Sequence, residues 1–141
     1  MMLDVQTVVF ILSLIAPGAE RLNDAPKVAE SIARYAETED EAIKLAVMGY
    51  YESRFKGTIT GDNGHAFGYL QLHNVEEQVG FDIDKSTLIA RDRLRKSGER
   101  CPDFPIALYA SGSCQRGRHV SNFRIWKIRE VQKKFDSTKE L

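Results

Sequence analysis

The chain has 141 residues, of which 43% are hydrophobic and 28% are charged, and its formal net charge at pH 7 is zero. This length and composition predict one soluble, folded domain over residues 1–141 and exclude a disordered or collagen-like chain. The charge is unevenly spread, because residues 1–90 hold 7 Lys and Arg against 14 Asp and Glu, whereas residues 91–134 hold 12 against 4. A basic segment can meet an anionic polymer, but charged runs are more often solvated helix faces, so charge alone assigns no partner.

The first predicted element is an apolar run at residues 7–16 (TVVFILSLIA). It is shorter than the about 20 residues that a membrane span requires, so we expect no span. The only charge before the run is Asp4, and a signal peptide normally has a basic segment there, so no cleavable signal is expected. We predict a core-facing helix that ends at Pro17 and Gly18.

A second helix is predicted to follow Asp24, which can cap it, with Pro26 in the first turn. Its apolar side chains fall at helical spacing, namely Val28, Ile32 and Tyr35.

The third helix, at about residues 39–55, is predicted to lie at the centre of the core. Thr38 followed by Glu41 is a capping-box pattern that opens it. Between Ala42 and Tyr51 only Lys44 is charged. A helix that is apolar on nearly all sides belongs inside a core.

The remaining chain predicts a loop or hairpin followed by short helices. Residues 56–65 are rich in Gly, Asn and Asp, and a short apolar stretch follows at residues 66–72. Further helices are expected at about residues 74–79, 85–97, 103–110 and 118–135, the last with an apolar face formed by Ile125, Trp126, Ile128, Val131 and Phe135. The predicted class is mainly α, with at most a small β element near residues 57–72.

No metal or cofactor site is expected. Cys101 and Cys114 lack the CxxC spacing of a zinc site, and the three His residues form no HExxH cluster. The two cysteines can form a disulfide outside the cytosol, or they can be small buried thiols, and the sequence leaves both alternatives open.

Glu52 is a candidate catalytic residue, because it lies at the end of the apolar third helix in line with Leu45 and Met48. An apolar surrounding and the negative end of the helix dipole both favour a protonated carboxyl, which suits a general acid. The alternative is a structural ion pair with Arg54, Lys56 or another base.

Three short motifs occur in order around this residue: ESRF from Glu52, GHAFGYLQL from Gly64, and ALYASG from Ala107. Together they resemble the soluble lytic transglycosylases, relatives of goose-type lysozyme, whose pattern is E-S-x-F, then G-x-x-G-L-M-Q-I, then A-Y-N-A-G. The resemblance covers roughly residues 42–112, about half of the chain, and it implies an α+β lysozyme-like fold around a central helix that ends at the catalytic Glu.

The resemblance also implies roles for individual residues. Glu52 is expected to be the catalytic acid and base, and Ser53, Tyr69, Gln71 and Tyr109 are expected to contact the sugar or the reacting centre. From the sequence alone, Ser53 can instead bond its own backbone, Gln71 can be a surface amide, and Tyr109 can be a core aromatic residue.

The chain also departs from the family pattern at several positions. Tyr69 and Leu70 replace the usual Leu-Met, which changes the cleft wall. Ala110 and Ser111 stand where the family has Asn and a small residue, so an amide that would contact sugar is missing.

The number of acids distinguishes two reactions. An inverting hydrolase needs a second carboxylate about 6.5–9.5 Å from the first, whereas a lytic transglycosylase needs one, because the sugar's own hydroxyl closes a 1,6-anhydro ring. Asp62, Glu76 and Glu77 are the candidates for a second acid, and Asp62 between two turn residues is first of all a turn residue itself. We therefore expect a transglycosylase acting on peptidoglycan, with a muramidase-type hydrolase as the alternative.

Two non-enzymatic alternatives differ in their signatures. A wall-binding or virion structural protein that had lost activity would be expected to lose Glu52 and Ser53, and a nucleic-acid-binding domain would use residues 91–134 with steep salt dependence. The expected partner is the peptidoglycan glycan strand rather than nucleic acid, and the protein is expected to be a monomer. Its location would be the periplasm, the cell wall or a virion.

Overall fold

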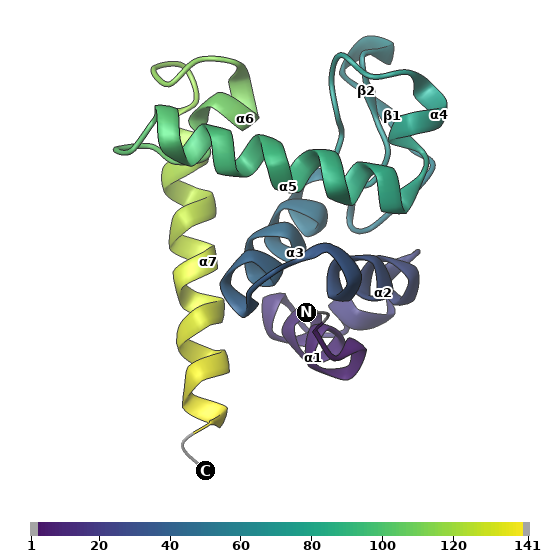
Figure 1. The fold of residues 1–141 in the computed structure, drawn as a ribbon, viewed down its shortest axis with the longest axis vertical. Helices are drawn as coiled ribbons and strands as arrows, with labels where there is room; N and C mark the ends of the chain where they lie inside the picture. Colours follow the sequence, from purple (N-terminus) through teal and green to yellow (C-terminus); the bar gives the residue numbers. More distant parts are fainter. Residues whose placement is uncertain (1–2, 140–141) are drawn as a thin grey trace.

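Helix α3 (Glu39–Ser53) is the element around which the others pack, as Figure 1 shows for the computed structural model, which describes residues 3–139. Helices α1 (Val5–Ile15), α2 (Ala25–Tyr35) and α7 (Arg118–Thr138) contact it from different sides, and α5 (Ile83–Arg100) crosses it. Its buried side chains form one hydrophobic core with those of the surrounding helices. The predicted central helix is confirmed.

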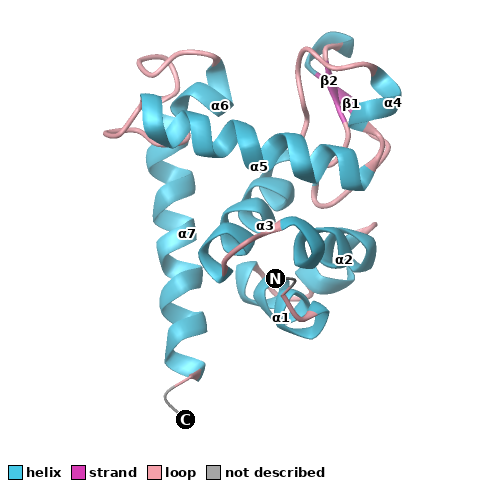
Figure 2. Ribbon diagram, viewed as in Figure 1, coloured by secondary structure: helices cyan, strands magenta, loops and turns pink. Residues whose placement is uncertain are grey.

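The small elements lie at the two ends of α5 (Figures 1 and 2). Strands β1 (Thr60–Gly61) and β2 (Ala66–Phe67) pair antiparallel, with η2 (Asp62–Gly64) between them, and α4 (Glu77–Gly80) packs beside β2 near the start of α5. Helix α6 (Ala107–Ser111) packs near the other end of α5. The short helix η1 (Ala19–Arg21) lies apart from these elements, because it follows α1 and contacts α1 and α2. The class is therefore mainly α with a small two-stranded sheet, as predicted.

The first helix is also confirmed, since its buried side chains Val8, Ile11, Leu12 and Ile15 repeat at helical spacing. In the part of the chain that the structure describes, no helix combines the length and apolarity that crossing a membrane would require.

Two helices begin or end at other residues than predicted, because of the turns beside them. Helix α5 continues to Arg100 because Ser97 is buried and its carbonyl accepts a hydrogen bond from the Cys101 amide at 2.9 Å. The predicted helix at residues 103–110 begins only at Ala107, since Pro105 lacks an amide hydrogen and two successive turns precede it.

The helix caps differ from the expected pattern. Thr38 accepts the Glu41 amide at 3.1 Å as predicted, but the Glu41 carboxylate accepts the amide of Glu37 rather than that of Thr38. Asp24 precedes α2 without capping it, because its carboxylate accepts the Gly57 amide at 2.7 Å. Asp24 therefore ties the start of α2 to the loop after α3.

The prediction that Trp126 lies on the buried face of α7 is wrong. Ile128, Val131 and Phe135 are buried, whereas Trp126 is 58% exposed. Its ring lies 6.1 Å from that of Phe123, which is also exposed, so α7 carries a surface aromatic pair.

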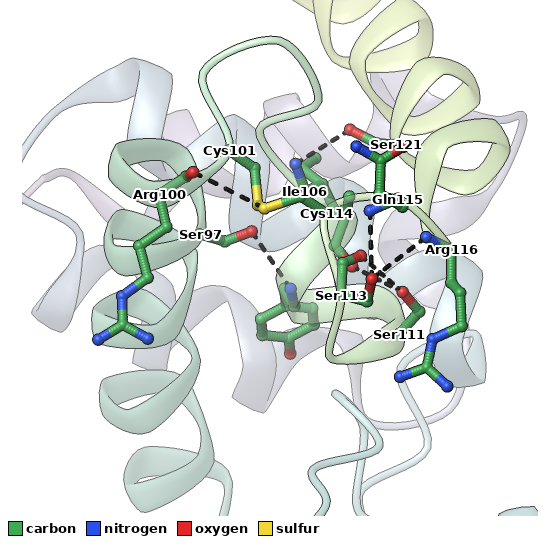
Figure 3. Close-up of a disulfide and its surroundings, with 12 residues drawn as sticks. Ser97, Arg100, Cys101, Ile106, Ser111, Ser113, Cys114, Gln115, Arg116 and Ser121 are labelled. Carbon is green, nitrogen blue, oxygen red and sulfur yellow. Dashed lines mark hydrogen bonds between the residues drawn. A yellow bond between two sulfur atoms is a disulfide. The ribbon is translucent and has the colours of Figure 1, made fainter.

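The two cysteines form a disulfide, which selects between the alternatives that the sequence left open. Figure 3 shows Cys101, at the end of α5, bonded to Cys114 in the loop after α6, with Cα atoms 5.5 Å apart. Ser97 and Ser121 bind backbone amides of Tyr109 and Ile106, so α5 and α7 both hold the segment that carries α6.

We predict that removing this disulfide destabilises the protein. The bond closes a loop with a sequence separation of 13, and loops of about this size contribute about 3 kcal/mol by restricting the unfolded chain. Denaturant unfolding of the double variant Cys101→Ser and Cys114→Ser measures the loss. Reduction of the unmodified chain should reproduce it, and equal stability of the reduced and oxidised forms would contradict the prediction.

A close backbone contact fixes the hairpin against α4. Gly68 has φ +84°, and a Cβ built there would lie 1.7 Å from the Gly80 carbonyl oxygen. Only glycine accommodates both the left-handed backbone and this approach.

Gly68→Ala should therefore lower the free energy of unfolding by about 2–4 kcal/mol. Gly98→Ala is the matched control, because a Cβ at that position in α5 meets no atom within 4 Å. It should raise the stability by about 0.5–1 kcal/mol through helix propensity. Chemical denaturation compares the two, and a similar effect of both changes would refute the contact.

Candidate active site

Glu52 lies in the last turn of α3. Its side chain is 25% exposed, and its Oε1 accepts a hydrogen bond at 3.1 Å from Nη2 of Arg124 on α7. The Arg124 side chain is 12% exposed, and its Nη1 lies 3.5 Å from the Met48 sulfur. The pair is thus largely shielded from water, where an ionic hydrogen bond is stronger than at the surface.

The neighbouring base proposed from the sequence does not bind Glu52. Arg54 ends α3 with φ 55°, and its guanidinium lies over the Tyr50 ring at 4.0 Å while donating to the Tyr50 carbonyl. The ion pair that the sequence left open is therefore formed, but with Arg124, 72 residues away in the chain.

Tyr109 of α6 lines a large cavity and is close enough to Glu52 to be affected by its charge. Its hydroxyl donates to the Leu70 carbonyl at 3.3 Å. Burial raises the pKa of the Tyr109 phenol, and the nearby Glu52 carboxylate raises it further. The phenol therefore remains protonated, and its hydrogen is engaged by the Leu70 carbonyl.

The cavity has a volume of about 1090 Å³ and lies between the β1–β2 hairpin, α5 and α6. This volume is at the upper end of the range for small-molecule sites and leaves room for more than one sugar ring. Glu52 is not among the residues that line the cavity, but its charge acts on Tyr109, which does line it. The lining residues include Asp62, Gln71, His73, Tyr109 and the basic side chains Arg93, Lys96 and Arg100.

Two of the predicted substrate-contacting residues lie inside the protein. The Tyr69 side chain is 0% exposed, and its hydroxyl is hydrogen-bonded to that of Thr87. Ser53 is buried, donates to the Tyr69 carbonyl at 2.7 Å and accepts the Lys56 amide at 3.1 Å. A direct substrate contact by Tyr69 does not fit this burial, because packing in the core occupies the whole ring. Both side chains hold the loop after β2 against α3.

Gln71 does line the cavity, as expected from its motif. Its φ is 50°, and its amide nitrogen donates to the Gly68 carbonyl at 2.9 Å and to the Ile59 carbonyl at 3.3 Å. These bonds fix the side chain at the cavity wall. The structure thus brings Gln71 and Tyr109 to the cavity, with Glu52 beside Tyr109.

Of the three candidate second carboxylates, Asp62 alone lines the cavity. It has φ 49°, as a turn residue can, and its carboxylate lies 2.7 Å from Nε2 of His73. Glu76 and Glu77 lie at the start of α4 and are exposed. Asp62 is therefore both the turn residue predicted from its neighbours and a cavity residue.

Aromatic side chains lie next to the Glu52–Arg124 ion pair. The Arg124 guanidinium lies 5.3 Å from the centre of the Tyr51 ring, which packs edge-on against Phe123 at 5.2 Å. Contacts thus run from Glu52 through Arg124 and Tyr51 to the exposed Phe123 of α7.

Within residues 3–139, no three His, Cys, Asp or Glu side chains gather in a way that would hold a metal ion. No family model, curated protein or solved structure matches this chain.

We predict that the Glu52–Arg124 pair couples α3 to α7. In a double-mutant cycle of Glu52→Gln and Arg124→Gln, each single change leaves one partly buried partner unmatched, and the coupling energy should be about 1 kcal/mol, because both groups keep some exposure. Denaturant unfolding of the four proteins measures it. Additive effects would show that the contact contributes no stability.

Proposed function

We propose that the protein is a lytic transglycosylase that cleaves the β-1,4 bond between N-acetylmuramic acid and N-acetylglucosamine in peptidoglycan, with Glu52 as its acid and base. The observation that carries the proposal is the position of Glu52. This partly exposed carboxyl ends a buried helix beside Tyr109, and Tyr109 and Gln71 line a cavity large enough for sugar rings. The three ordered sequence motifs support the same assignment.

A lysozyme-like fold is part of this proposal. A central apolar helix that ends at the acid, a small hairpin after it and a helix carrying Tyr109 support such an arrangement. Because the substrate is a wall polymer, the protein would act in the periplasm, in the cell wall or from a virion.

In the proposed reaction, protonated Glu52 gives its proton to the glycosidic oxygen as the bond to C1 of the muramic acid breaks. The C6 hydroxyl of the same sugar then attacks C1, and the Glu52 carboxylate accepts that hydroxyl's proton, which restores the acid. The products are a free N-acetylglucosamine hydroxyl and a 1,6-anhydromuramic end. No water is consumed.

Arg124 also has a role in this scheme. At 3.1 Å it stabilises the carboxylate that forms after the first proton transfer. Exposed aromatic rings lie beyond Arg124, and they give the glycan a surface on which to pack.

A muramidase-type hydrolase is the second candidate, and the position of Asp62 is the observation that favours it. Asp62 lines the cavity, and its contact with His73 orients the carboxylate. An acid held in this way could activate water on the opposite face of the sugar. A non-catalytic wall or virion protein is the third candidate.

Digestion of purified peptidoglycan tests the assignment. Glu52→Gln should lower the rate at least about 100-fold, because it removes proton transfer at both steps. Mass spectrometry of the product ends should find anhydromuramic acid, whereas reducing ends would favour the hydrolase.

Two variants sharpen this test. Glu77→Gln removes an exposed carboxyl outside the cavity and should retain activity. Asp62→Asn should retain anhydro product formation in a transglycosylase and abolish turnover in an inverting hydrolase. Equal activity of Glu52→Gln and the unmodified chain would rule out Glu52, and an inactive unmodified chain would support the binding-protein alternative.

A further inference from the structure

Three basic side chains of α5 face the cavity. Arg93, Lys96 and Arg100 all line it, and their spacing of three and four residues places them along one face of the helix. Positions seven apart are separated by about 10 Å along a helix axis. The row therefore runs along the cavity wall instead of forming a single cluster.

The two faces of α5 differ in how their charges are matched. Arg91 and Arg95, outside the cavity, form ion pairs with carboxylates, and Arg95 binds Glu41 through two bonds of 2.7 and 2.8 Å. Within the described chain, no carboxylate lies within 4.0 Å of the basic groups of Arg93, Lys96 or Arg100. Over residues 3–139, the only hydrogen bond of these three basic groups is that of Arg93, which donates to the His73 carbonyl at 2.8 Å.

The cavity contains little negative charge to balance this row. Among the residues that the structure describes, Asp62 is the one acid that lines it, and Asp62 is engaged by His73. The backbone at the end of the row is held in place, since Arg100 directly precedes the disulfide-bonded Cys101 (Figure 3). An unmatched row of cations in a concave site favours an anionic ligand.

We propose that the basic row binds the carboxylates of the peptide stems carried by muramic acid, so that the substrate is glycan bearing stems rather than bare glycan. This inference rests on the proposed function. The sugar backbone itself offers few charges, whereas a peptide stem carries carboxylates along its length. A row of about 10 Å matches about three residues of extended peptide.

The shape of the site favours a peptide over a phosphate polymer. A nucleic-acid duplex is a convex rod, which contacts basic side chains on an outer surface or inserts a protein element into its groove. Arg93, Lys96 and Arg100 instead line a concavity that also holds Gln71 and Tyr109. A flexible stem branching from a bound sugar can enter this space.

Binding measurements in a Glu52→Gln background test the inference without turnover. The probes are a disaccharide carrying a tetrapeptide stem and the same disaccharide without it, with calorimetry giving Kd. The double variant Lys96→Gln and Arg100→Gln should bind the stem-bearing probe about ten-fold more weakly, and the ratio between the two probes should fall by the same factor. Added salt should reduce this preference.

A matched control removes the same number of charges outside the cavity. Lys85 on α5 and Lys133 on α7 are exposed and do not line the cavity, so Lys85→Gln with Lys133→Gln should leave the ratio unchanged. An equal loss in this control would overturn the inference, because it would show a general charge effect. Equal binding of both probes by the unmodified cavity would also overturn it, as would tighter binding of a glycerol-phosphate polymer or duplex DNA.

The result remains distinguishable from failure of the proposed function. If the unmodified chain does not cleave peptidoglycan but binds stem-bearing probe through Lys96 and Arg100, the enzymatic proposal fails and the stem site stands. If it cleaves bare and stem-bearing strands equally well, the enzymatic proposal stands and the stem site fails.

Discussion

Burial of α3 on nearly all sides is the constraint on which the rest of this structure depends. Helices α1, α2, α5 and α7 all contact it, and its side chains from Ala42 to Gly49 are buried apart from Lys44. Each buried apolar side chain of this kind contributes roughly 1.5–3 kcal/mol relative to exposure. The two ends of the helix are less buried, and Glu52 lies in its last turn. The same packing that stabilises the helix therefore holds one carboxyl at the edge of a largely dry interior.

The Glu52–Arg124 contact supplies the charged partner that a carboxylate at this position requires. A carboxylate at the border of the core is costly unless it is paired, and α7 supplies the partner while packing against α3. The pair therefore links α3 to α7 at the border of the core, where loss of either partner would leave the other unmatched.

Sequence reasoning predicted the elements of this fold better than it predicted the directions of side chains. A single charge, Lys44, in a long apolar stretch was enough to identify the central helix, because helix burial follows local composition. Trp126 was assigned to the wrong face, since a large aromatic residue fits helical spacing without being buried. The disulfide could not be decided either, because sequence separation does not report the distance between two cysteines.

In the candidate site, too, the sequence predicted which residues gather better than it predicted where their side chains point. The motifs identified Gln71 and Tyr109, which line the cavity, and Glu52, whose charge acts on Tyr109. They could not show that Tyr69 points into the core, where Thr87 meets its hydroxyl, because neighbouring loop residues can face opposite directions. Arg124 carries no local signal, because only the packing of α7 on α3 brings it to Glu52.

The electrostatics of α5 connect the uneven charge of the sequence to the site. The acidic residues of the first half, Glu37 and Glu41, neutralise the outer face of this helix, where ion pairs join it to the chain around the start of α3. In the part of the chain that the structure describes, the three cations of the inner face form no ion pair. Asp62 is the one described acid that lines the cavity with them, and His73 already engages it. A zero net charge therefore conceals a local positive excess. Cations that form no ion pair within the fold remain available for a ligand. An anionic group would therefore be recognised at the inner face of α5 and not by the basic half as a whole.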